Sequence, residues 1–277
     1  MKPVAIARTA IKALRDPVDL DQHIMGTYLS LRIAMALLAF LLPVLLFYGG
    51  THQLWWISDV LPGQNSLSAY YHAAPHAIPG KCEHHAGVYR DLFVGILAAI
   101  SLSLVAYKGY GKLENWLLNL SGFCLACVAF FPMAWPEEGV KGCKDPFPGS
   151  MLLGNPNLSI HFVAAGFFFL LLMFVVWFTS KNTLKLVQEI PNREGRQISS
   201  RLANKIQFWR KVYNVCGWLI PGPFVIGLLG WIYGKQLHWN RFVLHAEWVG
   251  IWVFAAYWLL KTLEIKSIKT DSLLIER

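Results

Sequence analysis

Six apolar runs, each long enough to cross a lipid bilayer as a helix, leave this chain of 277 residues few alternatives for its fold. A hydrocarbon core of about 30 Å takes roughly 20 helical residues to cross. Runs of this length occupy residues 29–49, 90–108, 116–134, 158–179, 212–233 and 243–262. Only 15% of the residues are charged, whereas soluble domains carry about 25%. The sequence therefore predicts an all-α, polytopic membrane helix bundle with six transmembrane helices, the fifth kinked at Pro221 and Pro223.

The segments between these runs show no sign of a separate soluble domain, so residues 1–277 are expected to form a single six-span membrane domain. Residues 1–28 mix apolar and basic positions in a way that favours an amphipathic leader on the cytoplasmic surface. Residues 50–89 contain paired Trp and paired Tyr residues, which accumulate at the level of lipid headgroups. We expect this outer loop to act as a lid. Residues 180–211 are expected to form a basic cytoplasmic loop, and residues 263–277 a cytoplasmic tail.

The distribution of Lys and Arg predicts the orientation of the bundle. Basic residues concentrate in the leader, in the second and fourth loops and in the tail, whose basic series begins at Lys261. The opposite loops carry Lys81, Arg90, Lys141, Lys144, Lys235 and Arg241. Loops rich in Lys and Arg stay in the cytoplasm, so both termini are expected there, with the protein in the inner (plasma) membrane of the cell. The net charge of +9 suits anionic lipid headgroups, so membrane lipids are the expected partners. No nucleic-acid partner is needed to explain this charge. The oligomeric state stays open.

Five ionisable or imidazole-bearing residues fall at or just inside the edge of the bundle that is predicted to face outward. They are His72, Asp91, His161, His245 and Glu247. Polar groups at membrane depth cost free energy unless they face a cavity, a partner or an ion. His245 and Glu247 lie two positions apart, about 200° around a helix, so one can face a shared centre while the other faces elsewhere, toward Arg90 or Arg241. With Tyr71, these residues predict a polar pocket under the outer loop.

Imidazoles and a carboxylate that converge from different helices form a ligand set that catalytic zinc uses. The metal ligands would be His72, Asp91, His161 and His245. Ser68, one helical turn before His72, and Asp91 would be the catalytic residues, with Ser68 positioning the attacking water or an oxyanion. Zinc would polarise the carbonyl of a lipid ester or amide, although no local H-E-x-x-H motif is present. Alternatively, the same side chains hydrogen-bond to one another and to loop backbone as links between helices.

Two cysteines are predicted to lie on the outer side, Cys82 in the first loop and Cys143 in the third. Oxidising conditions there would permit a disulfide that ties the two loops together over the pocket. Two unpaired loop thiols are the alternative, because sequence does not supply the separation that disulfide geometry demands. Cys124 and Cys127 form a C-x-x-C within an apolar run, where small buried helix residues are the plainer interpretation.

Three short segments resemble the signatures of a known six-span family. They are WISD at residues 56–59, IHFVAAGFF at residues 160–168 and AEWVG at residues 246–250. The family includes the damage-regulated autophagy modulators, the yeast Sfk proteins and the GPI-anchor remodelling factor related to them, and the resemblance implies a protein that binds or organises lipids. Three further segments resemble uncharacterised bacterial multi-span proteins, for which no activity is implied: SLSAYYH at residues 66–72, RDLFVG at residues 90–95 and YKGY at residues 107–110.

A second resemblance concerns the order of three residues, Ser68, His72 and Asp91. A Ser-x-x-x-His followed by an Asp early in the next span is similar to the pattern of the CREST superfamily of alkaline ceramidases and adiponectin-type receptors. That family binds zinc with histidines and hydrolyses lipid amides. This chain departs from it in having six predicted spans where seven are usual, and in having Val249 where a late H-x-x-x-H pair starting at His245 would need histidine.

These observations favour two functions of different classes. The first is an integral membrane protein with an outer-facing polar pocket that binds or organises lipids, as the six-span resemblance implies. The second is a zinc-dependent hydrolase of a lipid ester or amide, as the polar cluster permits. A small-solute transporter ranks third, because no charged residue is placed near the bilayer midplane. Whether the protein is an enzyme, and whether it binds zinc, stays open.

Overall fold

The computed structural model describes residues 17–51, 65–72, 88–133, 159–193 and 198–275. These residues are almost wholly helical. The elements are α2 (Pro17–Thr51), η1 (Ser68–His72), α3 (Val88–Ala106), α4 (Lys112–Phe130), α5 (Ile160–Phe174), η4 (Val175–Thr179), α6 (Asn182–Arg193), α7 (Ser200–Leu219), α8 (Gly222–Tyr233) and α9 (Phe242–Ile275). The all-α prediction is confirmed, and no β-strand is assigned within the ranges just given.

Six helical stretches are long and apolar enough to cross a membrane, as predicted. Four of them are single helices, α2, α3, α4 and α9, and the other two are composite. The stretch Ile160–Glu189 joins α5, the π-helical turn η4 and most of α6, and the stretch Ser200–Tyr233 joins α7 and α8. The fifth stretch breaks between Leu219 and Gly222, where Pro221 lacks an amide hydrogen and proline rings crowd the preceding turn. The protein is therefore a multi-pass membrane protein.

Several helices extend beyond the apolar runs that predict them. Helix α2 begins at Pro17, inside the predicted leader of residues 1–28, and α9 continues to Ile275 through the predicted tail of residues 263–277. Hydropathy marks only the apolar part of a helix, whereas the helix continues for as long as its backbone can form hydrogen bonds four residues apart. Residues 1–16 lie outside the described ranges.

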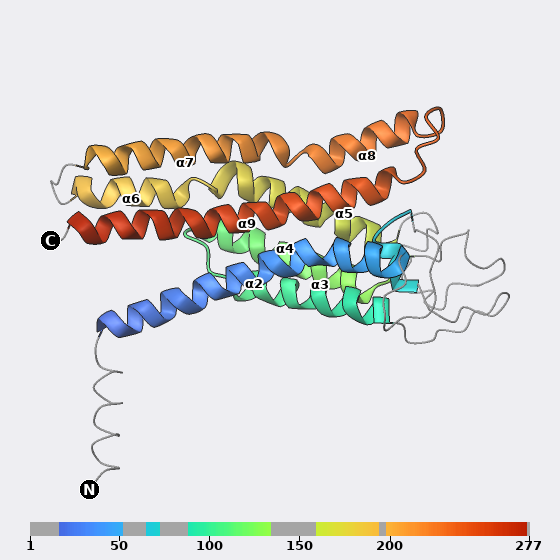
Figure 1. Ribbon diagram of the computed structural model, residues 1–277, viewed down its shortest axis with the longest axis horizontal. Helices are drawn as coiled ribbons and strands as arrows, with labels where there is room; N and C mark the ends of the chain where they lie inside the picture. Colours follow the sequence, from blue (N-terminus) through green and yellow to red (C-terminus); the bar gives the residue numbers. More distant parts are fainter. Residues whose placement is uncertain (1–16, 52–64, 73–87, 134–158, 194–197, 276–277) are drawn as a thin grey trace, which may run out of the picture.

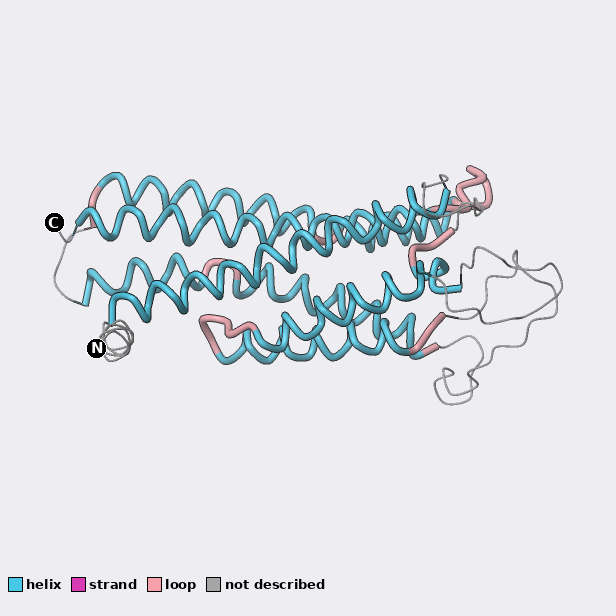
Figure 2. Tube along the Cα trace, turned by 60° about the horizontal axis from the view of Figure 1, so that its bottom comes forward, coloured by secondary structure: helices cyan, strands magenta, loops and turns pink. Residues whose placement is uncertain are grey.

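The helices run along the long axis of the molecule, and α9 joins its two sides (Figure 1). Helix α9 packs against α2 on one side and against α7 and α8 on the other, while α3 packs against α2 and α4, and α4 against α5. Helix α2 begins and α9 ends at one end of the bundle, called here the terminal end. The other end, where η1 and the starts of α3 and α9 lie, is called the η1 end (Figures 1 and 2).

Candidate functional site

The segment of residues 65–72 inserts between the helices at the η1 end. Its apolar side chains anchor it, because Leu67 and Tyr70 are almost fully buried. The amide of Leu244, near the start of α9, donates to the carbonyl of Asn65 at 3.0 Å. The 3-10 helix η1 then runs from Ser68 to His72. This segment therefore brings polar side chains from a loop into the interior of the bundle.

Glu247, on the second turn of α9, holds this segment through its carboxylate. The Ser66 hydroxyl lies 2.9 Å from both carboxylate oxygens, and the amide of Leu67 donates to Oε2 at 2.6 Å. The hydroxyl of Ser68 lies 3.2 Å from Oε1. Hydrogen bonds to a charged acceptor are roughly twice as strong as those between neutral groups. The Glu247 carboxylate thus accepts hydrogen bonds from Ser66 and Leu67 and lies in contact with Ser68.

His161, on the first turn of α5, is the second polar side chain that contacts Ser68. Its ring is 1% exposed, with Nε2 at 2.8 Å from the Ser68 hydroxyl and Nδ1 at 2.9 Å from the carbonyl oxygen of Phe131. Because a carbonyl oxygen only accepts hydrogen bonds, Nδ1 must carry the proton. In the neutral ring Nε2 is then an acceptor aimed at the Ser68 hydroxyl. The Phe93 ring stacks on the imidazole at a centroid distance of 6.5 Å.

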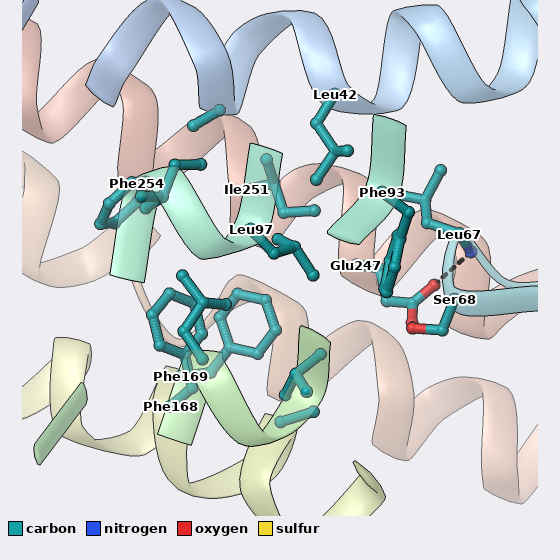
Figure 3. A pocket seen from close by; sticks show the side chains of 15 residues that line it. Leu42, Leu67, Ser68, Phe93, Leu97, Phe168, Phe169, Glu247, Ile251 and Phe254 are labelled. Atoms are coloured by element: carbon teal, nitrogen blue, oxygen red, sulfur yellow. Dashed lines mark hydrogen bonds between the residues drawn. The ribbon is translucent and has the colours of Figure 1, made fainter. Parts of the chain in front are cut away.

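A central apolar pocket begins at these polar groups. It offers about 70 Å³ to water-sized molecules, several times the roughly 10–15 Å³ that one water needs. Its apolar walls come from α2, α3, α4, α5 and α9 and from Leu67: Ala39, Leu42, Leu67, Phe93, Leu97, Ile100, Leu125, Val128, Ala165, Phe168, Phe169, Ile251 and Phe254. Figure 3 shows Ser68 and Glu247 together at one end of the pocket, and Phe168, Phe169 and Phe254 at the other.

The structure brings some of the predicted site residues together and separates others. His161 and Glu247 meet through Ser68, as a shared polar pocket predicts. Of the two residues two positions apart on α9, Glu247 faces the pocket, while His245 is exposed and accepts a hydrogen bond from the Trp239 indole at 3.0 Å. The predicted role of His245 in the shared centre is therefore corrected, and the helical offset of about 200° explains why both cannot face it.

Asp91 also lies apart from the buried groups. Its side chain is 67% exposed and pairs with Arg90 at 3.3 Å, in the first turn of α3, where the helix dipole favours a carboxylate. Tyr71 is partly buried, with its ring edge toward Phe93. His72 ends η1, but its side chain lies outside the described part of the structure, as do Cys82 and Cys143 of the predicted disulfide.

The described residues do not fit the predicted zinc site. In the ranges that the structure covers, no group of three or more His, Cys, Asp or Glu side chains could hold a metal ion. The proposed ligands Asp91 and His245 have other partners, and both ring nitrogens of His161 are already hydrogen-bonded. Cys124, Cys127 and Cys216 are free thiols. We therefore derive no chemistry from a metal.

Two members of the site have no role in the sequence-based prediction. Ser66 begins the segment SLSAYYH of residues 66–72, but only the folded loop shows that its hydroxyl reaches Glu247. The Phe131 carbonyl, just past the end of α4, fixes the tautomer of His161, and no side-chain pattern could reveal a backbone atom in this role.

A second buried polar group, the Arg32 cluster, lies deeper toward the terminal end and consists of Tyr28, Arg32, Tyr107, Lys261 and Glu264. Arg32 is fully buried, with its guanidinium 4.6 Å from the ring centroid of Tyr28 and 4.8 Å from that of Tyr107. It donates to the Tyr107 hydroxyl and, at 3.3 Å, to the carbonyl of Lys261. Burial raises the pKa of the Tyr107 hydroxyl well above its usual range, so this group meets Arg32 as a neutral dipole.

Lys261 supplies the second cation of the Arg32 cluster. Its ammonium group donates to Glu264 at 3.0 Å, to the Thr183 hydroxyl at 2.9 Å and to the Ser180 carbonyl, just past η4, at 2.7 Å. Tyr213 donates to the same carboxylate oxygen of Glu264. The ion pair is 1% and 0% exposed. Helices α2, α7 and α9 and the residue after η4 are thereby joined through buried charged groups, one of which, Lys261, was expected to begin the basic series of a cytoplasmic tail.

Comparison with protein-family models, with curated proteins and with solved structures finds no match, so the two family resemblances stay predictions.

Proposed function

We propose that this protein binds a membrane lipid, with a hydrocarbon chain of the lipid in the central pocket and its polar linkage at Ser68 and Glu247. The observation that supports this most is the pocket itself: apolar walls from five helices, with two polar side chains at one end. Pockets for small molecules are lined mainly by apolar and aromatic groups, with a few placed polar groups that fix orientation. An apolar cavity of this kind favours hydrocarbon over water.

The polar end would select the lipid. A chain that leaves the bilayer for the pocket exchanges one apolar environment for another, so the chain alone gives little hydrophobic driving force. The Glu247 carboxylate accepts hydrogen bonds only, and Glu247 lines the pocket. A lipid with an amide N–H or a hydroxyl beside its acyl linkage would therefore fit better than a simple diacyl ester.

The same proposal includes an orientation, with the η1 end facing outward from the plasma membrane and the terminal end in the cytoplasm. Exposed basic residues support it. Lys185, Arg201 and Lys211 lie on α6 and α7, the helices on the side of the terminal end, whereas Lys235 and Arg241 lie in the short α8–α9 connection at the η1 end. The excess of basic residues marks the cytoplasmic side.

Cysteine labelling tests this orientation. In a background without native cysteines, Lys185→Cys and Lys235→Cys place single thiols at exposed positions on opposite ends. An impermeant maleimide added to intact cells should label the thiol at position 235 and leave the thiol at position 185 unlabelled until the cells are opened. The reverse pattern would overturn the orientation.

Lipid retention tests the pocket. The protein is purified in mild detergent with extended washing, and the retained lipids are quantified by mass spectrometry. Ala165→Phe would fill the pocket that Ala165 lines, whereas Gly166→Phe adds the same ring where a Cβ meets nothing within 4 Å. We expect one enriched lipid in the wild type and in the Gly166 variant and its loss in the Ala165 variant. Equal retention in all three proteins, or no enriched lipid in the wild type, would refute the proposal.

A further inference from the structure

We infer that Ser68 is a nucleophile that accepts the acyl group of the bound lipid, with His161 as its general base. This makes the protein an acyl hydrolase or acyltransferase, and it rests on the proposed lipid binding. The geometry that leads to it is the Ser68–His161 pair, 2.8 Å apart, at the polar end of an apolar pocket. A nucleophile and a base within hydrogen-bonding distance, with the base oriented by a third group, is the arrangement that activates serine.

The third group is the Phe131 carbonyl. It accepts the Nδ1 proton of His161 at 2.9 Å, which leaves the lone pair of Nε2 directed at the Ser68 hydroxyl. A carboxylate holds the imidazole in this tautomer in the familiar triads, and a fixed carbonyl performs the same orienting task without a charge.

The proton of Ser68 has two acceptors within reach, His161 and Glu247. The shorter distance is to His161, and Glu247 already accepts hydrogen bonds from the Ser66 hydroxyl and the Leu67 amide. We therefore assign the hydroxyl proton to the 2.8 Å hydrogen bond with Nε2 of His161, in preference to the 3.2 Å contact with Glu247. The Glu247 carboxylate, 3.2 Å from the Ser68 hydroxyl, would stabilise with its negative charge the imidazolium that forms when His161 takes the proton.

The location of Ser68 restricts its substrate. Ser68 is 5% exposed, and it lines the central pocket. An acyl chain lying in the pocket would bring its carbonyl carbon to the polar end, next to the Ser68 oxygen. The substrate class is therefore a lipid carboxylic ester or amide with a medium or long chain, and short soluble esters are poor substrates because they leave the apolar walls unfilled.

The reaction balances without an external oxidant or reductant. The Ser68 oxygen forms a bond to the acyl carbon as its proton moves to Nε2 of His161. The bond between the acyl carbon and the leaving oxygen or nitrogen then breaks, and His161 returns the proton to the leaving group. Water, or the hydroxyl of a second lipid, then attacks the acyl carbon as His161 takes its proton. The bond between the acyl carbon and the Ser68 oxygen breaks, His161 returns the proton to Ser68, and a free acid or a new ester is released.

A fluorophosphonate with a long alkyl chain tests this inference. The serine oxygen displaces fluoride from phosphorus, and the adduct is located by peptide mass spectrometry on the purified full-length protein. We expect one adduct, at Ser68, and none in Ser68→Ala. His161→Gln should slow labelling by about 100-fold or more, the range in which a general base contributes.

Ser101→Ala is the matched control. Ser101 is also 5% exposed, but its hydroxyl donates to a backbone carbonyl, that of Gly122, at 2.7 Å. This variant should be labelled as fast as the wild type. Elution from a sizing column and retained lipid establish that each variant is folded.

Two results would overturn the inference while leaving lipid binding intact: a wild-type protein that retains its lipid yet forms no adduct at Ser68, or labelling that His161→Gln does not slow. Loss of the enriched lipid from the wild type itself would instead refute the proposed function. A chain-length series of p-nitrophenyl esters gives a second readout, with octanoate hydrolysed faster than acetate in the wild type and this preference lost in Ala165→Phe.

Discussion

The two buried polar regions of this bundle differ in what surrounds them. At the η1 end, Ser68, His161 and Glu247 meet beside a pocket, which Ser68 and Glu247 line. In the Arg32 cluster, two cations are enclosed by aromatic rings and an ion pair, and none of its residues lines the central pocket. The two regions lie about 21 Å apart along α9, measured from Glu247 to Lys261 at about 1.5 Å per residue.

The contrast separates a site from a structural link. Buried charges that are paired and hydrogen-bonded to several helices, as Arg32, Lys261 and Glu264 are, are costly to disturb, and their partners fix how the helices pack. Groups beside a cavity keep interactions available for a ligand, and active sites often give up stability for that reason. We therefore expect substitutions in the Arg32 cluster to reduce mainly stability, and substitutions around Ser68 to reduce mainly function.

The largest effect on stability is expected for Glu264→Gln. The amide can still accept from Tyr213, but it leaves the charge of Lys261 buried without its counter-ion. Breaking a buried ion pair on one side costs about 3–5 kcal/mol. The free energy of unfolding is measured by titrating detergent-solubilised protein with a denaturing detergent.

A matched control uses the exposed Lys266 on the same helix, where Lys266→Gln should change the unfolding free energy by less than about 0.5 kcal/mol. The double variant Lys261→Met with Glu264→Gln should recover part of the loss, because no unpaired charge remains. A loss below about 1 kcal/mol for Glu264→Gln alone would mean that water reaches the pair, and the contrast between the two regions would fail.

The number and approximate place of the spans could be predicted because hydropathy over 20 residues reports directly on what a membrane requires. Pro221 likewise marks the helix break through its own chemistry. The cluster at the η1 end was predicted in outline from depth alone, and His161 and Glu247 do share Ser68. The depth of a residue in the membrane does not say in which direction its side chain points around the helix axis. Depth alone therefore groups Asp91 and His245 with residues whose environment they do not share.

The Arg32 cluster escaped prediction for a different reason. Lys261 follows 19 residues after the start of α9, close to the length that crosses the hydrocarbon core, and a basic residue at that point normally reaches the headgroups. Here α9 continues to Ile275, with η4, α6 and α7 packed beside it, so neighbouring helices enclose the side chain. Arg32 lies inside an apolar run. Its contacts with Tyr28 and Tyr107 become apparent only when the folded structure brings these rings beside the guanidinium.

A smaller loss of stability is expected for Glu247→Ala. It removes the acceptor for the Ser66 hydroxyl and the Leu67 amide and releases residues 65–72 from α9. Hydrogen bonds to a charged group contribute about 1.5–3 kcal/mol. Hydrogen–deuterium exchange should show faster exchange of the Leu67 amide, with no change at Tyr213 or Ser267 near the Arg32 cluster. A loss greater than that of Glu264→Gln would reverse the order that the comparison predicts.

The smallest effect on stability, together with the largest effect on function, is expected for Ser68→Ala. The substitution removes one hydroxyl, while Glu247 keeps its bonds from Ser66 and Leu67, so the cost is about 0.5–1.5 kcal/mol. The same preparation should retain its lipid and lose all fluorophosphonate labelling. If Ser68→Ala instead costs about 3 kcal/mol or more, Ser68 and His161 hold helices together in the way that Lys261 and Glu264 do. The alternative of polar links between helices would then describe both ends of the bundle, and the contrast between a site and a structural link would disappear.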